Sequence, residues 1–251
     1  MKDESLGENI LKKDIKILDM EMELEKVYSP ILKFLAELLG TTFLIFTFLL
    51  LLVFKSDYGY YNFEVPLILT TMIYLFGKIS GGHFNPAVSI PMCLRKKISL
   101  CECFYSLGAQ ILGGFIANIL IGLIRFRAKF KKLYTSFIRT SRNHYYSQSW
   151  AYANGFICEM ISSFIFVLVI FGSNPKEKKT ESYIIIGITY YILCSYNIIF
   201  SGDSLNPAMS LTSEVILAFS GESIYLSQFW IFTLAPIIGG IAAGFAFMLF
   251  E

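Results

Sequence analysis

Residues 80–89 read SGGHFNPAVS, and residues 201–210 read SGDSLNPAMS. Six of the ten positions are identical at a constant offset of 121 residues. The shared core is Asn85-Pro86-Ala87 in the first copy and Asn206-Pro207-Ala208 in the second, and each copy interrupts an apolar stretch. A polar break at mid-membrane depth, made twice by one chain, indicates a pore or binding site between two related halves.

The composition around these copies is that of a membrane protein. Of 251 residues, 55% are hydrophobic and only 16% are charged, with a mean hydropathy of +0.59. Residues 226–250 carry no charge at all. Apolar runs of about 20 residues are long enough to cross a bilayer core of about 30 Å as a helix. The formal net charge of +2 gives no indication of a nucleic-acid partner.

The apolar stretches predict an all-α membrane protein. Six spanning helices are expected at 31–54, 62–79, 102–124, 153–173, 182–201 and 226–250. Two shorter apolar pieces, 85–94 and 206–219, each open with Asn-Pro. Asn is a strong helix N-cap and Pro is favoured in the first helical turn, so both pieces are predicted to begin helices. Their length is about half a bilayer at 1.5 Å per residue, which predicts re-entrant half-helices.

The repeat extends beyond the tripeptides and predicts an inverted arrangement. Glu37 lies 48 residues before the first Asn, and Glu159 lies 47 residues before the second. Repeat one (31–124) and repeat two (153–250) therefore each contain three spans and one half-helix, and loop 125–152 links them. Because three spans is an odd number, the second repeat enters the membrane from the opposite side.

Small residues recur at helical spacing in the third and sixth spans. Such faces let membrane helices approach closely. The residues concerned are Gly113, Gly114, Ala117, Gly239, Gly240, Ala243 and Gly244.

The distribution of positive charge predicts the orientation of the chain in the membrane. With the N-terminus inside, the inner segments carry twelve Lys and Arg and the outer loop 125–152 carries seven, which favours cytoplasmic N- and C-termini. The basic outer loop either meets an anionic lipid or partner or is simply solvated. Residues 1–30 form a cytoplasmic tail without a cleavable signal sequence, which either lies on the membrane as an amphipathic helix or frays in solvent.

Neither the cysteines nor the histidines suggest catalysis or a metal. Cys101 and Cys103 are two residues apart, which is not a zinc-site spacing, and the five cysteines are interpreted as buried thiols. His83 and His144 are 61 residues apart with no nucleophile or metal motif around them. We expect no enzyme activity and no cofactor.

Taken together, these motifs resemble those of the aquaporin, or major intrinsic protein, family. The resemblance covers about residues 31–250. It rests on the paired Asn-Pro-Ala motifs, the segment ISGGHFNPAV at 79–88, Glu37 and Glu159, Gln110, and PIIGG at 236–240. It implies an hourglass of six helices and two half-helices meeting at mid-membrane. It also implies a homotetramer in which every protomer has its own pore.

The residues themselves suggest how such a pore works. Opposed half-helices aim their positive N-terminal ends at the centre, which sets a barrier to cations and to protons. Asn85 and Asn206 cap the half-helices through their oxygens and are predicted to turn their amide donors to the lumen; the alternative is simple helix capping. Glu37 and Glu159 are predicted to brace the re-entrant loops, because a carboxylate facing lipid is costly. His83 is predicted to brace its own loop.

The chain departs from the family pattern at the expected constriction. Met209 stands where most members carry Arg, and the other three constriction positions fall on Val65, Cys194 and Asp203. Without a fixed cation, and with small side chains, the aperture is predicted to be wider and more apolar than in a strict water channel. Asp203 either attracts cations at the mouth or caps the loop that leads into the second half-helix. Ser210 and Phe232 give mixed markers, so the sequence does not assign a subfamily.

The resulting hypothesis is a passive, single-file channel for water and small neutral solutes such as glycerol, urea, ammonia or peroxide. The alternative is a structural or adhesive membrane protein of the same fold whose pore conducts poorly.

Overall fold

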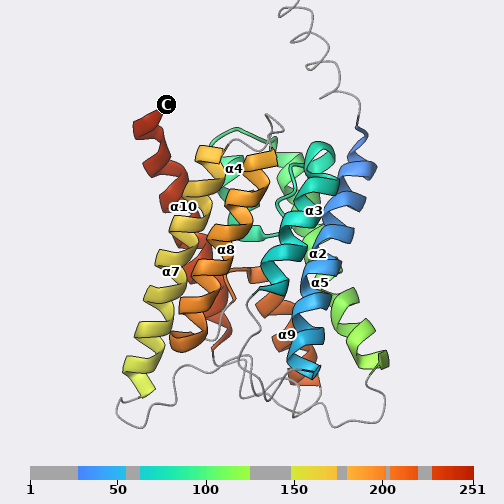
Figure 1. Ribbon diagram of the computed structural model, residues 1–251, viewed down its shortest axis with the longest axis vertical. Coiled ribbons are helices and arrows are strands. Elements are labelled where there is room, and N and C mark those ends of the chain that lie inside the picture. Colours follow the sequence, from blue (N-terminus) through green and yellow to red (C-terminus); the bar gives the residue numbers. More distant parts are fainter. Residues whose placement is uncertain (1–27, 55–62, 125–147, 174–179, 202–203, 220–227) are drawn as a thin grey trace, which may run out of the picture.

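The computed structural model describes residues 28–54, 63–124, 148–173, 180–201, 204–219 and 228–251, and within these ranges every regular element is a helix (Figure 1). The elements in chain order are α2 (Pro30–Phe54), α3 (Glu64–Ser80), α4 (Pro86–Leu94), α5 (Leu100–Ile124), α7 (Gln148–Ser173), α8 (Thr180–Phe200), α9 (Pro207–Phe219), α10 (Phe229–Ala246) and the 3-10 helix η3 (Phe247–Phe250). The predicted all-α fold is confirmed, with six long helices and two short ones. The tail 1–27 and most of loop 125–152 lie outside the described residues, so the expectations for them stay predictions.

The two largest differences from the expected spans are the start of α7 and the end of α10. The helix α7 begins at Gln148 rather than at 153, so the polar residues before the apolar run extend it. The last span ends as an α-helix at Ala246 and finishes in the 3-10 turn η3. Tightening of the final turn into a 3-10 helix is common at helix ends, where the last carbonyls lack partners.

Length and composition alone qualify four of the described helices to cross a membrane. They are Pro30–Leu52, Leu100–Ile124, Tyr152–Ser173 and Phe229–Phe250. The helices α3 and α8 fall outside that set, and they are equivalent members of the two repeats that pack against each other. Their hydroxyl side chains bond back to their own helices: Thr70 donates to the Pro66 carbonyl at 2.9 Å, and Ser195 donates to the Tyr191 carbonyl at 2.8 Å. These bonds satisfy the hydroxyls in an apolar surrounding.

The short helices α4 and α9 lie at opposite ends of the bundle (Figure 1). Each is held by the last long helix of the other repeat, because α4 packs against α10 and α9 packs against α5. A Cβ placed on Gly240 would stand 2.2 Å from the Ala87 carbonyl oxygen, and one on Gly114 would stand 3.1 Å from the Ala208 carbonyl oxygen. The absence of a side chain at these two glycines therefore lets the backbones of α4 and α9 pack directly against α10 and α5.

A second pair of glycines brings together the long helices within each repeat. A Cβ on Gly113 would stand 2.8 Å from the Leu38 carbonyl oxygen, which joins α5 to α2. One on Gly239 would stand 2.1 Å from the Met160 carbonyl oxygen, which joins α10 to α7. The small-residue faces expected from the sequence are therefore sites of close helix approach.

The end of α4 is also connected to the last residue of the chain. The Glu251 carboxylate forms ion pairs with Arg95 and with Lys97, the latter at 2.8 Å. The hydrogen bond from Lys97, together with the two positive charges, lowers the pKa of the Glu251 carboxyl. The Lys97–Glu251 ion pair is solvent-exposed, so its contribution to the stability of the fold is small.

Substituting Gly240 by Ala should destabilise the protein, because the new methyl group meets a backbone oxygen that no side-chain rotation can move. Overpacking of this kind costs about 1–3 kcal/mol. The measurement is the thermal midpoint of the detergent-solubilised protein, followed by size-exclusion chromatography after heating. Gly108→Ala on α5 is the matched control, since a Cβ there has nothing within 4 Å. Equal midpoints for the two variants would contradict the close approach of α10 and α4.

Candidate functional site

The two half-helices begin with the same cap. Asn85 stands in an extended conformation before α4, and its Oδ1 accepts a hydrogen bond from the Ala87 amide at 2.8 Å. Asn206 Oδ1 accepts one from the Ala208 amide at 3.0 Å. Pro occupies the next position in both copies, where a missing N–H is no loss. Both asparagines are almost completely buried.

The two caps also bind each other's loop. Asn85 Nδ2 donates to the Leu205 carbonyl at 2.8 Å, and Asn206 Nδ2 donates to the Phe84 carbonyl at 2.9 Å. Phe84 and Leu205 both have a φ of 50°, which is uncommon for residues with a large side chain. These matched turns precede the asparagines at the same offset. The first and second repeats are therefore joined at the centre by a reciprocal pair of hydrogen bonds.

The Glu37 carboxylate of α2 organises the first re-entrant loop. Its Oε1 accepts from Ser80 Oγ at 2.7 Å and from the His83 amide at 2.9 Å. Its Oε2 accepts from the Phe84 amide at 2.7 Å and from Gln110 Nε2 at 2.7 Å. The carboxylate is fully buried, and these four donors replace the water that it has lost.

The Glu159 carboxylate of α7 does the same for the second loop. Its Oε1 accepts from Ser201 Oγ at 2.6 Å, from the Ser204 amide at 3.2 Å and from Asn197 Nδ2 at 3.4 Å. Its Oε2 accepts from the Leu205 amide at 2.8 Å. Three of the four donors are equivalent by the repeat to those around Glu37. The loop-bracing role proposed for both glutamates is supported by this geometry.

The fourth donor differs between the repeats, and the sequence did not single it out. In the first repeat it is Gln110 of α5; the equivalent position in α10 is Pro236, which has no side-chain donor. Asn197 of α8 supplies the missing amide, and it also accepts a hydrogen bond from Ser162 Oγ at 2.7 Å. The only available signal was a single amide side chain inside the apolar span 182–201.

The His83 ring lies inside the first loop. Its Nδ1 is 3.1 Å from Ser89 Oγ, which also accepts a hydrogen bond from Gln110 Nε2 at 2.9 Å. The ring thus connects the loop to the first turns of α4. A bracing role for His83 stays a prediction that these contacts support.

Three of the four residues expected at the constriction belong to one continuous apolar cluster. Val65 of α3, Cys194 of α8 and Met209 of α9 are each at most 4% exposed. Asp203 lies outside the described residues, so its two alternative roles stay open.

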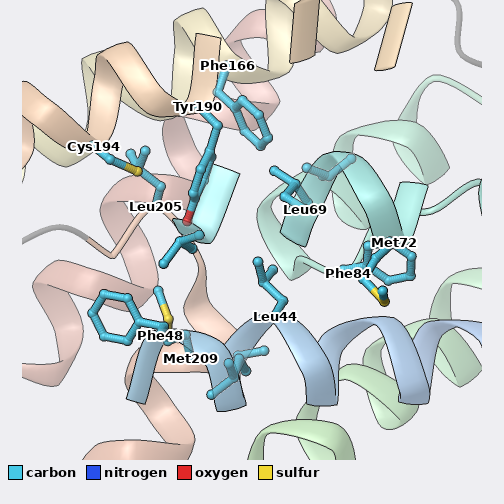
Figure 2. Close-up of a cluster of buried hydrophobic side chains, with 14 of the residues drawn as sticks. Leu44, Phe48, Leu69, Met72, Phe84, Phe166, Tyr190, Cys194, Leu205 and Met209 are labelled. Carbon is cyan, nitrogen blue, oxygen red and sulfur yellow. The ribbon is translucent and has the colours of Figure 1, made fainter. Parts of the chain in front are cut away.

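The side chains around this cluster are apolar as well. Figure 2 shows Met209 beside Phe48 and Cys194 near Leu205, with Leu44 on the same helix, α2, as Phe48. Sequence analysis did not identify Leu44 and Phe48, because no motif marks them within the first span. Met209 therefore packs within the buried apolar cluster, where a family arginine would place a charge.

A third buried carboxylate, Glu214 on α9, lacks the hydrogen-bond donors that surround Glu37 and Glu159. Glu214 is fully buried, and neither of its carboxylate oxygens has a hydrogen-bond partner among the described residues. It lies one helical turn beyond Ser210, whose hydroxyl bonds to the Phe232 carbonyl of α10 at 3.1 Å. The face of α9 that bears Glu214 therefore turns towards α10.

Comparison with known proteins agrees with this architecture. The profile of the family described as "Major intrinsic protein" matches residues 23–247. The chain is 32% identical over 219 residues to "Glycerol uptake facilitator protein-like 6" of Lactiplantibacillus plantarum, covering 85% of this chain and 95% of that protein. It is 29% identical over 221 residues to "Aquaporin Z" of Photorhabdus laumondii, covering 84% of this chain and 94% of that protein.

A solved structure shows the same fold. The X-ray structure of the aquaglyceroporin from Plasmodium falciparum superposes with a TM-score of 0.69 at 23% sequence identity. The match covers 87% of this chain and 96% of that chain. The hourglass arrangement expected from the sequence is therefore confirmed at the level of the fold.

Replacing Glu37 by Gln should destabilise the protein. Both carboxylate oxygens now accept hydrogen bonds, and in glutamine one of them becomes an NH₂ group that faces other donors. Hydrogen bonds to a charged group contribute about 1.5–3 kcal/mol each. Glu214→Gln is the matched control, since no described donor depends on that carboxylate. The measurement is the thermal midpoint in detergent. A loss for Glu214→Gln as large as that for Glu37→Gln would contradict the bracing role.

Proposed function

This chain belongs to the major intrinsic protein family, and we propose from that premise that its pore admits neutral solutes larger than water through an aperture without a fixed positive charge. The protein is an integral membrane protein that forms a passive channel for water and small solutes. Members of this family transport rather than catalyse, and we expect the same of this chain. The observation that carries the proposal is the buried Met209, which replaces the expected arginine among apolar neighbours.

Exclusion of cations then rests on the centre of the pore. Each half-helix carries roughly half a positive charge at its N-terminus. The two N-caps, Asn85 and Asn206, each bond to the opposite loop, so both positive ends lie near the centre. A cation that reaches this point meets two like-signed dipole ends, which a single file of water screens far less than bulk solvent does. This arrangement supports exclusion of protons and metal ions without the help of an arginine.

The two asparagines would provide the polar contact for the permeating molecule. A side-chain amide carries two hydrogens, and one from each asparagine is already donated to the opposite loop. The second hydrogen of each is left for an oxygen in the lumen. A water held by two such donors accepts both bonds and points its own hydrogens away, which interrupts proton hopping along the file.

The apolar outer aperture favours neutral solutes with some apolar surface. Met209 offers no donor and no charge, and Val65 and Cys194 are smaller than the aromatic and histidine side chains of water-selective relatives. The relatives named above include both a glycerol facilitator and an aquaporin. We therefore expect glycerol, urea, ammonia or peroxide to pass together with water.

We further propose a homotetramer in which each protomer conducts, with both termini on the cytoplasmic side. Helical faces of α2, α3 and α8 carry exposed apolar side chains, which lipid or neighbouring protomers would cover. Mass measurement of the detergent-free particle tests the assembly, and protease access from each side of sealed vesicles tests the orientation.

Stopped-flow swelling of proteoliposomes should show water and glycerol entry well above that of empty vesicles. The same vesicles should show no proton conductance in response to a pH gradient. Rates equal to those of empty vesicles would instead support a structural or adhesive protein with a poorly conducting pore.

Substituting Met209 by Arg should reduce glycerol entry several-fold more than water entry. The guanidinium narrows the aperture and adds N–H donors and a positive charge that methionine lacks. Met209→Leu is the control, since it preserves volume and apolar character. Parallel water and glycerol rates in one preparation give the ratio. An unchanged ratio in Met209→Arg would mean that this side chain does not line the constriction.

A further inference from the structure

Two thiols approach each other at the end of α4, away from the pore centre. Cys93 stands in the last turn of α4, and Cys103 stands in the first turns of α5. A short connection, residues 95–99, joins the two helices. Neither cysteine forms a disulfide in the structure. Neither takes part in the caps, the loop bracing or the apolar aperture.

The position of Cys103 is fixed by a contact with α4. Its Sγ donates to the Ser89 carbonyl at 3.8 Å, and its side chain is 6% exposed. In an α-helix the carbonyl of Ser89 faces the amide of the residue four positions on, which is Cys93. Side chains at i and i+4 share one face and lean back towards the preceding turn. Cys93 is therefore directed at the spot where Cys103 touches α4.

The two side chains are neighbours across the contact between α4 and α5. Cys103 touches α4 at the Ser89 carbonyl, and Cys93 stands one helical turn further along on the same face of α4. The packing of α4 against α5 brings the adjoining backbones together as well, which a disulfide requires. Cys101 is exposed, and an offset of two residues turns it to another face of α5.

We propose that Cys93 and Cys103 are a redox-active thiol pair that a peroxide closes to a disulfide. Cys93 is only partly buried and is reached first, whereas Cys103 is buried and acts second. The closed bond fastens the end of half-helix α4 to α5, and a dithiol reductant opens it again.

The chemistry balances with peroxide as the oxidant. The Cys93 thiolate attacks the O–O bond, forming an S–O bond and releasing hydroxide, which takes up a proton to give water. The Cys103 sulfur then attacks the Cys93 sulfur and gives up its proton, forming the S–S bond and displacing the oxygen as a second water. Two thiols lose two electrons, and one hydrogen peroxide gains them.

The test uses the full-length protein in proteoliposomes treated with hydrogen peroxide. Remaining thiols are blocked with N-ethylmaleimide, and the digest is analysed by mass spectrometry. We expect a peptide pair linked through Cys93 and Cys103 within one chain, which dithiothreitol separates. We also expect an upward shift of several degrees in the thermal midpoint of the oxidised protein, because a cross-link restricts the unfolded chain.

Matched variants identify the pair. Cys101→Ser should retain the link, and Cys103→Ser should abolish both the link and the shift in midpoint. A link from Cys93 to Cys101, a link between chains only, or oxidation of Cys93 without any link would overturn the proposal. The mass spectrum of the unsubstituted protein decides this even if a variant folds poorly. Swelling rates play no part, so the result is independent of the channel assignment.

Discussion

A helix that begins in the middle of a membrane exposes backbone N–H groups where no bulk water can satisfy them. This chain has two such helices, and the structure meets the constraint with two buried carboxylates. Glu37 and Glu159 reach from neighbouring spans and accept the amides of the loops that lead into α4 and α9. The side-chain oxygens of Asn85 and Asn206 then satisfy the first helical turns. The placement of both half-helix N-termini depends on these fixed loops.

The same constraint makes the two repeats depend on each other. Each asparagine donates to a carbonyl of the opposite loop, and each half-helix packs on a glycine of the opposite repeat. Neither repeat alone would satisfy its own centre. The cross-bonds use one amide hydrogen of each asparagine, and the second hydrogen of each remains for a permeating molecule. The single-file path therefore depends on the presence of both repeats. Selectivity is a separate matter, which we propose is set by side chains such as Met209 that the backbone arrangement does not require.

Features that depend on local sequence could be predicted, whereas features that depend on how helices rotate against each other could not. Asn followed by Pro marks a helix start on its own, so the half-helices could be predicted from sequence. A glutamate in an apolar run must face protein, which is why the sequence also proposed the two bracing glutamates. Asn197 could not be predicted, because the repeat places Pro236 where its amide donor would be expected, and a different helix supplies the group. Leu44 and Phe48 were likewise missed, since only the packing of α2 decides which of its many apolar residues meet Met209.

The central claim is that the two asparagine caps meet at mid-membrane and share a continuous water path. An experimental density map of the reconstituted protein, at a resolution that shows ordered water, tests it most directly. We expect Asn85 and Asn206 side by side, each bonded to the opposite loop, with a water between their amide nitrogens and a file of waters above and below. Asparagines on opposite membrane faces, or packed side chains that seal them from any water, would contradict the account.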